Sequence, residues 1–260
     1  MPCGRMPGST VMCEDWLVPD WPAAPHVRAV CTTRRGGHSV GPYSSMNPAD
    51  HVGDDPAAVR ANRQMLHQVL QLPAEPRWLQ QVHGTAVIDA TEAVEAGRVP
   101  VADAACCSQP GVVCAVLTAD CLPVLLCDRA GRQVAALHAG WRGLAAGVIE
   151  QTVDTMQQPG EALLAWLGPA IGPAAYQVGD EVREAFLKHD QQAQAAFQSD
   201  PEGGWKADLY RLARQRLAAR GVSAIYGGNE CSFSDAERFY SYRRDGDTGR
   251  MASLIWLQAG

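Results

Sequence analysis

The stretch that decides the fold reads VVCAVLTADCLPVLLCDRAGRQVAALHAG and covers residues 112–140. It holds three apolar runs, residues 112–117, 123–127 and 133–137, and the turn-forming sequence DRAG separates the last two. Short apolar runs bounded by turn residues are typical of buried strands, and a short turn between two of them indicates a hairpin. The stretch therefore predicts a buried β region, and a helix is expected from Gly140 to about Met156.

Helices and strands alternate irregularly on both sides of this region. Asp55 and Pro56 form an N-cap and first-turn pair that begins a helix ending near Leu70, and Gly221 ends a helix that begins near Asp208. Another helix is predicted over residues 179–188. The remaining predicted strands cover residues 26–33, 78–82, 86–90, 162–167, 222–226, 239–242 and 252–257. This order predicts one α/β (α+β) domain with mixed sheets rather than a doubly wound parallel sheet.

The composition is that of a folded globular protein. Hydrophobic residues make up 47% and charged residues 19% of the 260 residues, close to globular averages. The 28 acidic residues outnumber the 22 basic ones and give a net charge of −6, which argues against nucleic acid or an anionic membrane as a partner. The most apolar stretch, residues 112–127, is interrupted by Asp120 and Pro123, and the first residues lack the apolar run of a secretory signal. We therefore expect a cytoplasmic protein.

Nine cysteines are unusual in a chain that is too large to need disulfide staples. In a reducing compartment they are expected to be free thiols, a minority of which bind metal or take part in catalysis. Those in apolar β segments are expected to lie in the core: Cys106, Cys107, Cys114 and Cys127. Cys3 and Cys13 belong to a tail, residues 1–14, that we expect to be disordered. Cys231 follows a predicted strand and Gly227-Gly228, so it is a candidate to line a site.

Three residues that could ligate a metal occur at strand ends or turns. They are His83 in QQVHG, Cys121 in TADCLP and His138 in HAGWRG. Their long-range spacing is unlike that of a zinc finger, but it suits a catalytic site in which three protein ligands leave a fourth position open. Two histidines and one cysteine suit Zn²⁺, and the thiolate could also accept copper.

Two other interpretations of these residues are compatible with the sequence. A lone His or Cys in an apolar strand is usually a packing residue. Cys121 could instead be a nucleophile with His138 as its base. Asp120 would raise the pKa of the neighbouring thiol unless a metal or a protonated His intervenes, which favours the metal site.

Two arginines are candidates for binding an anion. Arg34 precedes Gly36-Gly37, where backbone N–H groups can approach a phosphate closely, and Arg142 lies in a glycine-flanked turn that opens a helix. The alternative is that both are ordinary surface or ion-pairing arginines.

Taken together, the motifs resemble those of the laccase-domain family, also called polyphenol-oxidase-like proteins and, in bacteria, purine nucleoside phosphorylase or peptidoglycan editing factor. They occur in order along nearly the whole chain: TTRRGGHS (32–39), PYSSMN (42–47), HVGDDP (51–56), WLQQVHG (78–84), TADCLPVLL (118–126), HAGWRGLAAGV (138–148), LGPAIGP (167–173) and FYSYRRDGDTGRMASLIWL (239–257). The resemblance implies a single catalytic domain over residues 15–260, layered α/β/β/α as in cysteine-hydrolase toxins. It also implies that His83, Cys121 and His138 bind zinc at the active centre.

The resemblance implies several activities that do not agree with one another. They are phosphorolysis of adenosine, inosine and methylthioadenosine, deamination of adenosine, copper-dependent phenol oxidation, and editing of a UDP-linked muropeptide by amide cleavage. Multicopper chemistry needs many histidines, whereas this chain has seven, so phenol oxidation is the least supported. A non-catalytic metal-binding scaffold is a further alternative.

The interpretation we favour is a zinc-dependent purine nucleoside phosphorylase with adenosine deaminase activity. Its substrates would be a purine nucleoside and phosphate, and the protein would be a monomer or weak homodimer. Arg34 and Arg142 would contact phosphate, Asn47 the ribose or base, and Asp120 would orient or exchange a proton near the metal.

Overall fold

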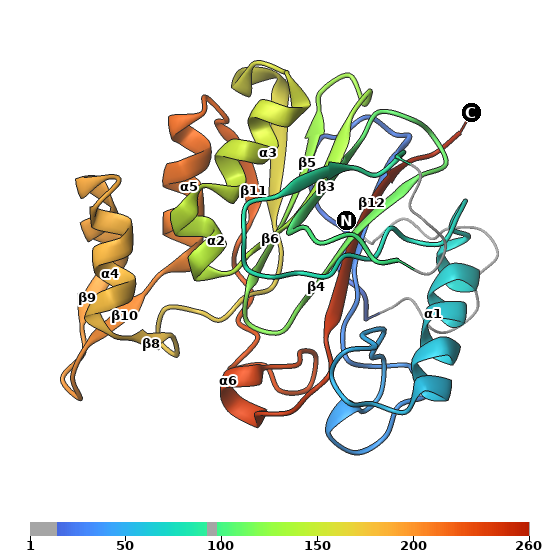
Figure 1. Cartoon of the computed structure of the whole chain (residues 1–260), viewed down its shortest axis with the longest axis horizontal. Helices are drawn as coiled ribbons and strands as arrows, with labels where there is room; N and C mark the ends of the chain where they lie inside the picture. The colour runs from blue at the N-terminus through green and yellow to red at the C-terminus, as the bar shows by residue number, and fades with distance from the viewer. Residues whose placement is uncertain (1–14, 93–97, 260) are drawn as a thin grey trace.

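Two β-sheets pack face to face at the centre of the computed structural model, which describes residues 15–92 and 98–259 (Figure 1). The larger sheet has six strands in the order β11-β7-β5-β6-β3-β2, and the smaller has three in the order β1-β12-β4. The six strands are β11 (Ala224–Gly227), β7 (Leu163–Leu167), β5 (Leu122–Asp128), β6 (Val134–Ala139), β3 (Ala104–Cys107) and β2 (Val87–Asp89). The three are β1 (Val27–Cys31), β12 (Met251–Leu257) and β4 (Val113–Thr118).

Strand direction in the six-stranded sheet is mixed. β5 is antiparallel to both β6 and β7, and β6 is antiparallel to β3, whereas β2 and β11 run parallel to their neighbours β3 and β7. The three-stranded sheet is antiparallel throughout. The predicted α/β (α+β) class with mixed sheets is therefore confirmed.

Helices cover the outer faces of the two sheets and complete four layers (Figure 1). The outer face of the six-stranded sheet packs against α2 (Trp141–Ala146), α3 (Val148–Met156) and α5 (Leu209–Ala219). The outer face of the three-stranded sheet packs against α1 (Pro56–Leu70), which Asp55 caps by accepting a hydrogen bond from the backbone N–H of Ala57. This is the α/β/β/α arrangement that the resemblance implied.

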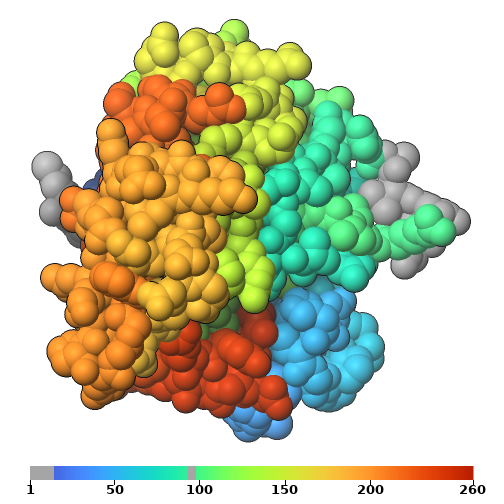
Figure 2. Space-filling view, turned by 60° about the vertical axis from the view of Figure 1, so that its left-hand side comes forward, coloured from blue at the N-terminus to red at the C-terminus, as the bar shows by residue number. Residues whose placement is uncertain are grey.

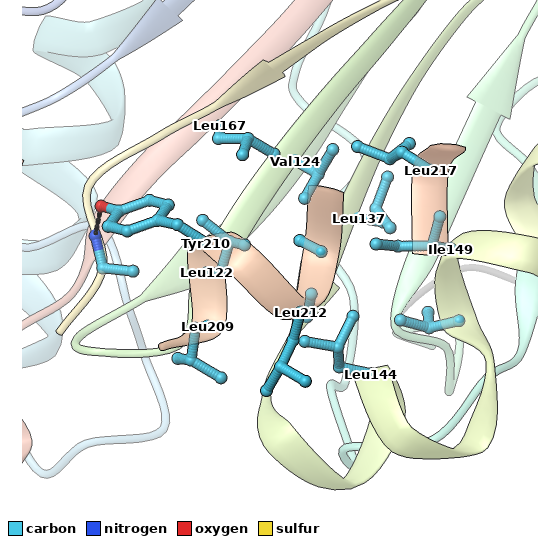
Figure 3. Packing of buried hydrophobic residues seen from close by; sticks show 14 of the residues in the cluster. Leu122, Val124, Leu137, Leu144, Ile149, Leu167, Leu209, Tyr210, Leu212 and Leu217 are labelled. Carbon is cyan, nitrogen blue, oxygen red and sulfur yellow. Dashed lines mark hydrogen bonds between the residues drawn. The ribbon is translucent and has the colours of Figure 1, made fainter. Parts of the chain in front are cut away.

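Side-chain alternation along the central strands builds the layers. In β5, Leu122, Val124 and Leu126 face the helices, whereas Leu125 and Cys127 face the other sheet. Leu122 and Val124 pack with Leu137 of β6 in one cluster with the leucines of α5 (Figure 3). Because both faces of the strand are buried, the sequence shows a continuous apolar run and not alternating polar residues.

The remaining elements lie at the periphery. A small sheet of β8 (Gln177–Val178), β10 (Trp205–Ala207) and β9 (Phe197–Ser199), which the sequence analysis did not predict, packs with α4 (Asp180–Leu187). The short helix α6 (Tyr242–Asp245) precedes β12. Three 3-10 helices complete the chain: η1 (Gly41–Tyr43), η2 (Gly160–Ala162) and η3 (Gln191–Ala196).

Three predicted elements were wrong in detail. The helix expected over residues 140–156 is broken into α2 and α3 at Gly147, whose φ of 102° is a left-handed conformation that an α-helix cannot continue through. Residues 78–82 form an isolated bridge between Gln80 and Val101 instead of a strand. Residues 239–242 form no strand either, because Ser241 caps α6 by accepting a hydrogen bond from the backbone N–H of Arg244.

Most cysteines lie where the sequence predicted. Those expected in the core are buried: Cys106, Cys107, Cys114 and Cys127. Cys3, Cys13 and the rest of the expected tail lie outside the described residues. None of the helices in the described part of the chain is long and apolar enough to cross a membrane.

Candidate metal centre and its surroundings

Antiparallel pairing of β5 with β6 brings two of the predicted ligands to one end of the six-stranded sheet. β5 begins where β6 ends, and the register pairs Pro123 with His138 and Leu122 with Ala139. Cys121, the residue before β5, therefore lies beside the end of β6. Two residues from separate motifs become neighbours because of this register.

His83 joins them from the loop between Gln80 and β2. Its Nε2 lies 3.7 Å from Sγ of Cys121, and its ring lies edge-on to that of His138, with the centroids 4.7 Å apart. The ligand atoms of the three residues all lie within 4.8 Å of one another. His138 is buried, Cys121 half-buried and His83 exposed, so the cluster opens to solvent on the side of His83. The three residues can hold a metal ion.

Two glycines let the loops meet this closely. A Cβ atom on Gly140 would lie 2.6 Å from Cδ2 of His83 and 3.1 Å from Sγ of Cys121, and one on Gly143 would lie 2.7 Å from the carbonyl oxygen of Gly84. Both distances to the backbone or ring are shorter than a real Cβ contact. The glycines of HAGWRG are therefore needed for close approach to the QQVHG loop.

The buried carboxylate of Asp103 is hydrogen-bonded to the backbone of His83 and to the ring of His138. It accepts a 2.8 Å hydrogen bond from Nδ1 of His138 and backbone hydrogen bonds from Val82, His83 and Gly84. Burial favours the neutral acid, but these hydrogen bonds outweigh burial and lower the pKa of Asp103. Asp103 was not among the predicted site residues, although a lone acidic residue in the apolar run VADAAC is a signal that could identify it.

The metal-free cluster carries opposite charges. Burial disfavours the thiolate of Cys121, but the charge and hydrogen bonding of His138, and then of His83, outweigh it and lower the pKa of Cys121 to about 6. Burial likewise disfavours protonation of His138, but the thiolate and Asp103 raise the pKa of His138 to about 9. At neutral pH the metal-free protein thus holds a Cys121 thiolate beside a protonated His138.

Asp120 precedes Cys121 in the chain, and its carboxylate is engaged by Ser232 and Arg243. Its φ is 86°, and its carboxylate accepts a 2.6 Å hydrogen bond from the hydroxyl of Ser232 and a 2.7 Å hydrogen bond from the backbone N–H of Arg243. The side chain therefore ties the β4–β5 connection to α6. Cys231, next to Ser232, accepts hydrogen bonds from the backbone N–H groups of Gly172 and Ser234.

Asn47, another predicted site residue, holds neighbouring loop segments together. The amide of Asn47 is buried, donates to Asp54 and to the carbonyl of Ala49, and accepts from the backbone N–H of Arg250. The amide of Asn47 is thus bonded within the protein, and its expected contact with ribose or base stays a prediction.

The guanidinium of Arg34 is also hydrogen-bonded within the protein. It donates to the carbonyls of Ser44 and Ala236, and its guanidinium lies 4.7 Å above the ring of Tyr240. These contacts engage part of the guanidinium, and the expected contact of Arg34 with phosphate stays a prediction.

Arg142, in contrast, is exposed, and its guanidinium lies 4.4 Å from the centre of the Trp141 ring. Among the described residues it makes no side-chain hydrogen bond or ion pair. Figure 2 shows the chain near residue 140, in yellow-green, meeting the teal chain near residue 80 and the red α6 segment on one face of the molecule. Arg142 is thus an exposed cationic group at the start of α2, four residues after His138.

Arg250 and Tyr176 were missed by the sequence analysis. Burial lowers the pKa of Arg250, and the charges that oppose this effect most are those of Cys121 and Asp120. Burial, and next the charge of Cys121, raise the pKa of Tyr176. Both residues therefore lie within electrostatic range of the cluster. Arg250 stands in the quoted motif FYSYRRDGDTGRMASLIWL, where the sequence gives no sign of which of the three arginines faces the site.

The layered fold and the His–Cys–His cluster define a class of protein. Residues 28–258 match the model of the family described as multi-copper polyphenol oxidoreductase laccase, and the chain belongs to this laccase-like family.

Two bacterial proteins that match nearly the whole chain are named as purine nucleoside phosphorylases. A protein of Pseudomonas aeruginosa that is 56% identical over 94% of this chain and 98% of its own length is named purine nucleoside phosphorylase. The purine nucleoside phosphorylase YfiH of Escherichia coli is 54% identical over 93% of this chain and 98% of its own. The crystal structure of a Neisseria meningitidis protein superposes with a TM-score of 0.91 at 50% identity, covering 95% of this chain and all 100% of that one. YlmD from Geobacillus stearothermophilus gives a TM-score of 0.84 at 30% identity over 96% and 98% of the two chains.

Proposed function

We propose that this protein is a zinc-dependent purine nucleoside phosphorylase. The observation that carries the proposal is the solvent-open cluster of His83, Cys121 and His138, with the exposed Arg142 at the start of α2, four residues after His138. Relatives with most of the same sequence bear the name of this activity. A metal centre and a cationic group are the two features that phosphorolysis at such a site needs.

The three side chains fit zinc. Bond lengths of roughly 2.0 Å to nitrogen and 2.3 Å to sulfur in a tetrahedron separate the two ligand atoms by about 3.5 Å. The 3.7 Å between Nε2 of His83 and Sγ of Cys121 agrees with this separation. Two imidazoles and a thiolate suit Zn²⁺, while copper would also accept the thiolate. When bound, zinc would supply a Lewis acid and an activated water at the fourth position.

The chain's own residues would bind and orient the phosphate. We assign this role first to Arg142, because the guanidinium groups of Arg34 and Arg250 each donate to two backbone carbonyls. In the reaction an oxygen of hydrogen phosphate bonds to C1′ of the ribose as the bond from C1′ to the purine nitrogen breaks. The purine leaves with the electron pair and takes the phosphate's proton. Asp120 would act indirectly, by holding the backbone of Arg243 and thus α6 at the edge of the site.

Adenosine deamination is proposed for the same site. Water would add at C6 of the purine, and ammonia would leave with the displaced electron pair and a proton. The feature that supports this second reaction is the solvent-open side of the cluster, which admits water next to the metal ligands. A coupled assay for ammonia with adenosine in the absence of phosphate tests it.

Amide cleavage in a muropeptide is the second candidate function. The observation that favours it is the order Asp103, His138, Cys121, in which a carboxylate orients a histidine beside a thiolate. That chemistry needs a metal-free thiolate, whereas phosphorolysis as proposed needs the metal. Phenol oxidation with several coppers is not proposed, because His83, Cys121 and His138 are the one His/Cys/acid cluster suited to a metal within residues 15–92 and 98–259.

The decisive experiment is incubation of metal-quantified protein with inosine and phosphate, followed by chromatography for hypoxanthine and ribose-1-phosphate. We expect both products in equal amounts, and we expect Cys121→Ala to lose turnover and zinc together. Phosphorolysis retained in Cys121→Ala would refute the mechanism. If the wild-type protein yields no product, the metal-free protein is tested on a UDP-linked muropeptide. Gel filtration in the same buffer tests the expected monomer or weak homodimer.

A further inference from the structure

The carboxylate of Asp103 is enclosed by hydrogen-bond donors from both sides of the metal cluster. Asp103 is fully buried and lies directly before β3. Its Oδ1 accepts from the backbone N–H of His83 at 2.9 Å and from Nδ1 of His138 at 2.8 Å. Its Oδ2 accepts from the N–H groups of Val82 at 3.2 Å and Gly84 at 2.6 Å. Every donor belongs to a segment that carries a metal ligand.

The backbone of Asp103 is fixed at the same time. Its N–H donates to the carbonyl of Ala86 at 3.0 Å, and its carbonyl accepts from the N–H of His138 at 2.7 Å. The carboxylate therefore has little freedom to move. Within the described chain its one ion-pair partner is His138. A buried carboxylate without Lys or Arg is costly, and here four donors compensate for it.

The hydrogen bonds from the loop act on His83 through its backbone. His83 has a φ of 59°, a left-handed conformation that residues other than glycine rarely adopt. Three consecutive N–H groups, those of residues 82–84, point at one carboxylate and hold the chain in this conformation. The ring of His83 thereby faces Sγ of Cys121.

The hydrogen bond to His138 acts through the ring. Because Nδ1 donates to Asp103, only Nε2 can ligate a metal. Carboxylates that accept from the second nitrogen of a ligating histidine fix its tautomer and orientation.

We propose that Asp103 is the positioning residue of the metal centre: one carboxylate sets the backbone of His83 and the ring of His138 in ligating geometry before the metal binds. This inference rests on the metal site of the proposed function but not on the reaction. Cys121 is held independently by β5, so Asp103 governs two of the three ligands. The role is structural preorganisation, and no substrate contact is required of Asp103.

Asp103→Asn tests the proposal, because an amide of the same shape has one oxygen and an NH₂ group that cannot accept. The chain offers a matched control in Asp128→Asn at the opposite end of β5. Asp128 is also buried and also accepts backbone hydrogen bonds, from Arg132 and Gln133. Zinc affinity is measured by competition with a chromophoric chelator, and folding by urea unfolding of the metal-free proteins.

We expect Asp103→Asn to lower zinc affinity by roughly 10- to 100-fold, whereas Asp128→Asn leaves it within about twofold. Wild-type affinity in a folded Asp103→Asn protein would overturn the proposal, and so would an equal loss in both variants. If Asp103→Asn does not fold, ¹⁵N NMR of the imidazoles in the wild-type protein tests the proposal instead. We expect zinc on Nε2 of His138 and a hydrogen-bonded proton on Nδ1. Zinc on Nδ1 of His138 would overturn the proposal. Zinc binding that depends on Asp103 without phosphorolysis would refute only the proposed reaction.

Discussion

Gly140 and His83 touch so closely that no side chain fits between them. A Cβ atom on Gly140 would lie 2.6 Å from Cδ2 of the His83 ring. Gly140 has a φ of −65°, so alanine is compatible with its backbone, and the constraint is steric alone.

Gly140→Ala should therefore displace His83 and weaken metal binding. We expect zinc affinity to fall by roughly 10- to 100-fold, because the three donor atoms remain but one is displaced. Gly84→Ala is the control, since its added Cβ would meet Asp103 at an ordinary 3.4 Å. The measurement is chelator competition on both variants, and unchanged affinity in Gly140→Ala would contradict the steric argument.

Thiol reactivity should single out Cys121 in the metal-free protein. Its pKa is lowered to about 6, whereas burial raises the pKa of Cys31 and of Cys127 to about 12. The thiolate fraction of Cys121 rises with pH, so alkylation by iodoacetamide should reach half its plateau rate near pH 6 and be blocked by zinc. Peptide mass spectrometry measures each site. Cys231, whose pKa is lowered by hydrogen bonds that outweigh burial, should react without protection by zinc.

Metal affinity should rise with pH in two ranges. A bound metal needs a thiolate and a neutral imidazole, and in the metal-free protein the pKa values of Cys121 and His138 are about 6 and about 9. The proton of His138 is therefore displaced between about pH 7 and pH 9, and that of Cys121 is displaced as well below pH 6, so at least two protons are released there. Apparent affinity should rise about tenfold per pH unit in the upper range and at least about a hundredfold per unit in the lower. Calorimetry in buffers of different ionisation enthalpy counts the protons, and zero release at pH 7.5 would refute the assignment.

Substitution of Arg142 should change the KM for phosphate, whereas substitution of Arg34 should change stability. Arg142→Ala should raise the KM for phosphate by about tenfold or more without changing stability, because the guanidinium is free. Arg34→Ala should cost about 1–2 kcal/mol of stability, because it removes hydrogen bonds to two carbonyls. Steady-state kinetics and urea unfolding separate the two. An Arg142→Ala enzyme with unchanged KM would exclude it from the phosphate site.

Asp120 should prove to be structural and not a ligand. Asp120→Ala should cost about 2–4 kcal/mol, since it leaves the donors of Ser232 and Arg243 unpaired and places alanine at a φ of 86°. Asp120→Asn should cost less, because asparagine tolerates this conformation. Both variants should retain zinc, measured by elemental analysis. Loss of zinc from folded Asp120→Asn would contradict this account.

The local elements of the fold were predictable because their signals lie within a few residues. Asp55 and Pro56 set the start of α1, and Asp208 caps α5 by accepting from the backbone N–H of Arg211. The continuous apolar runs of β4, β5 and β6 follow from burial on both faces. The predicted helix runs through Gly147 because only the backbone conformation of this residue, with a φ of 102°, reveals the break.

The contacts between distant segments were not predictable in the same way. Arg34 and Arg142 both follow or flank glycines in the sequence, yet one is engaged by carbonyls and the other is free. Asn47 stands in a loop rich in polar residues, yet its amide is buried and fully bonded. Whether a polar group is available depends on neighbours brought together by the tertiary structure.

The sequence by itself determined the donor atoms, because His83, Cys121 and His138 carry the chemistry that binds a soft divalent metal wherever they stand. The tertiary structure alone decided that they meet. The register of β5 on β6 sets Cys121 beside His138, the glycines of HAGWRG admit the ring of His83, and the carboxylate of Asp103 holds both histidines. Ligand identity is a property of side chains, whereas ligand geometry depends on hydrogen bonds and packing between segments far apart in the chain.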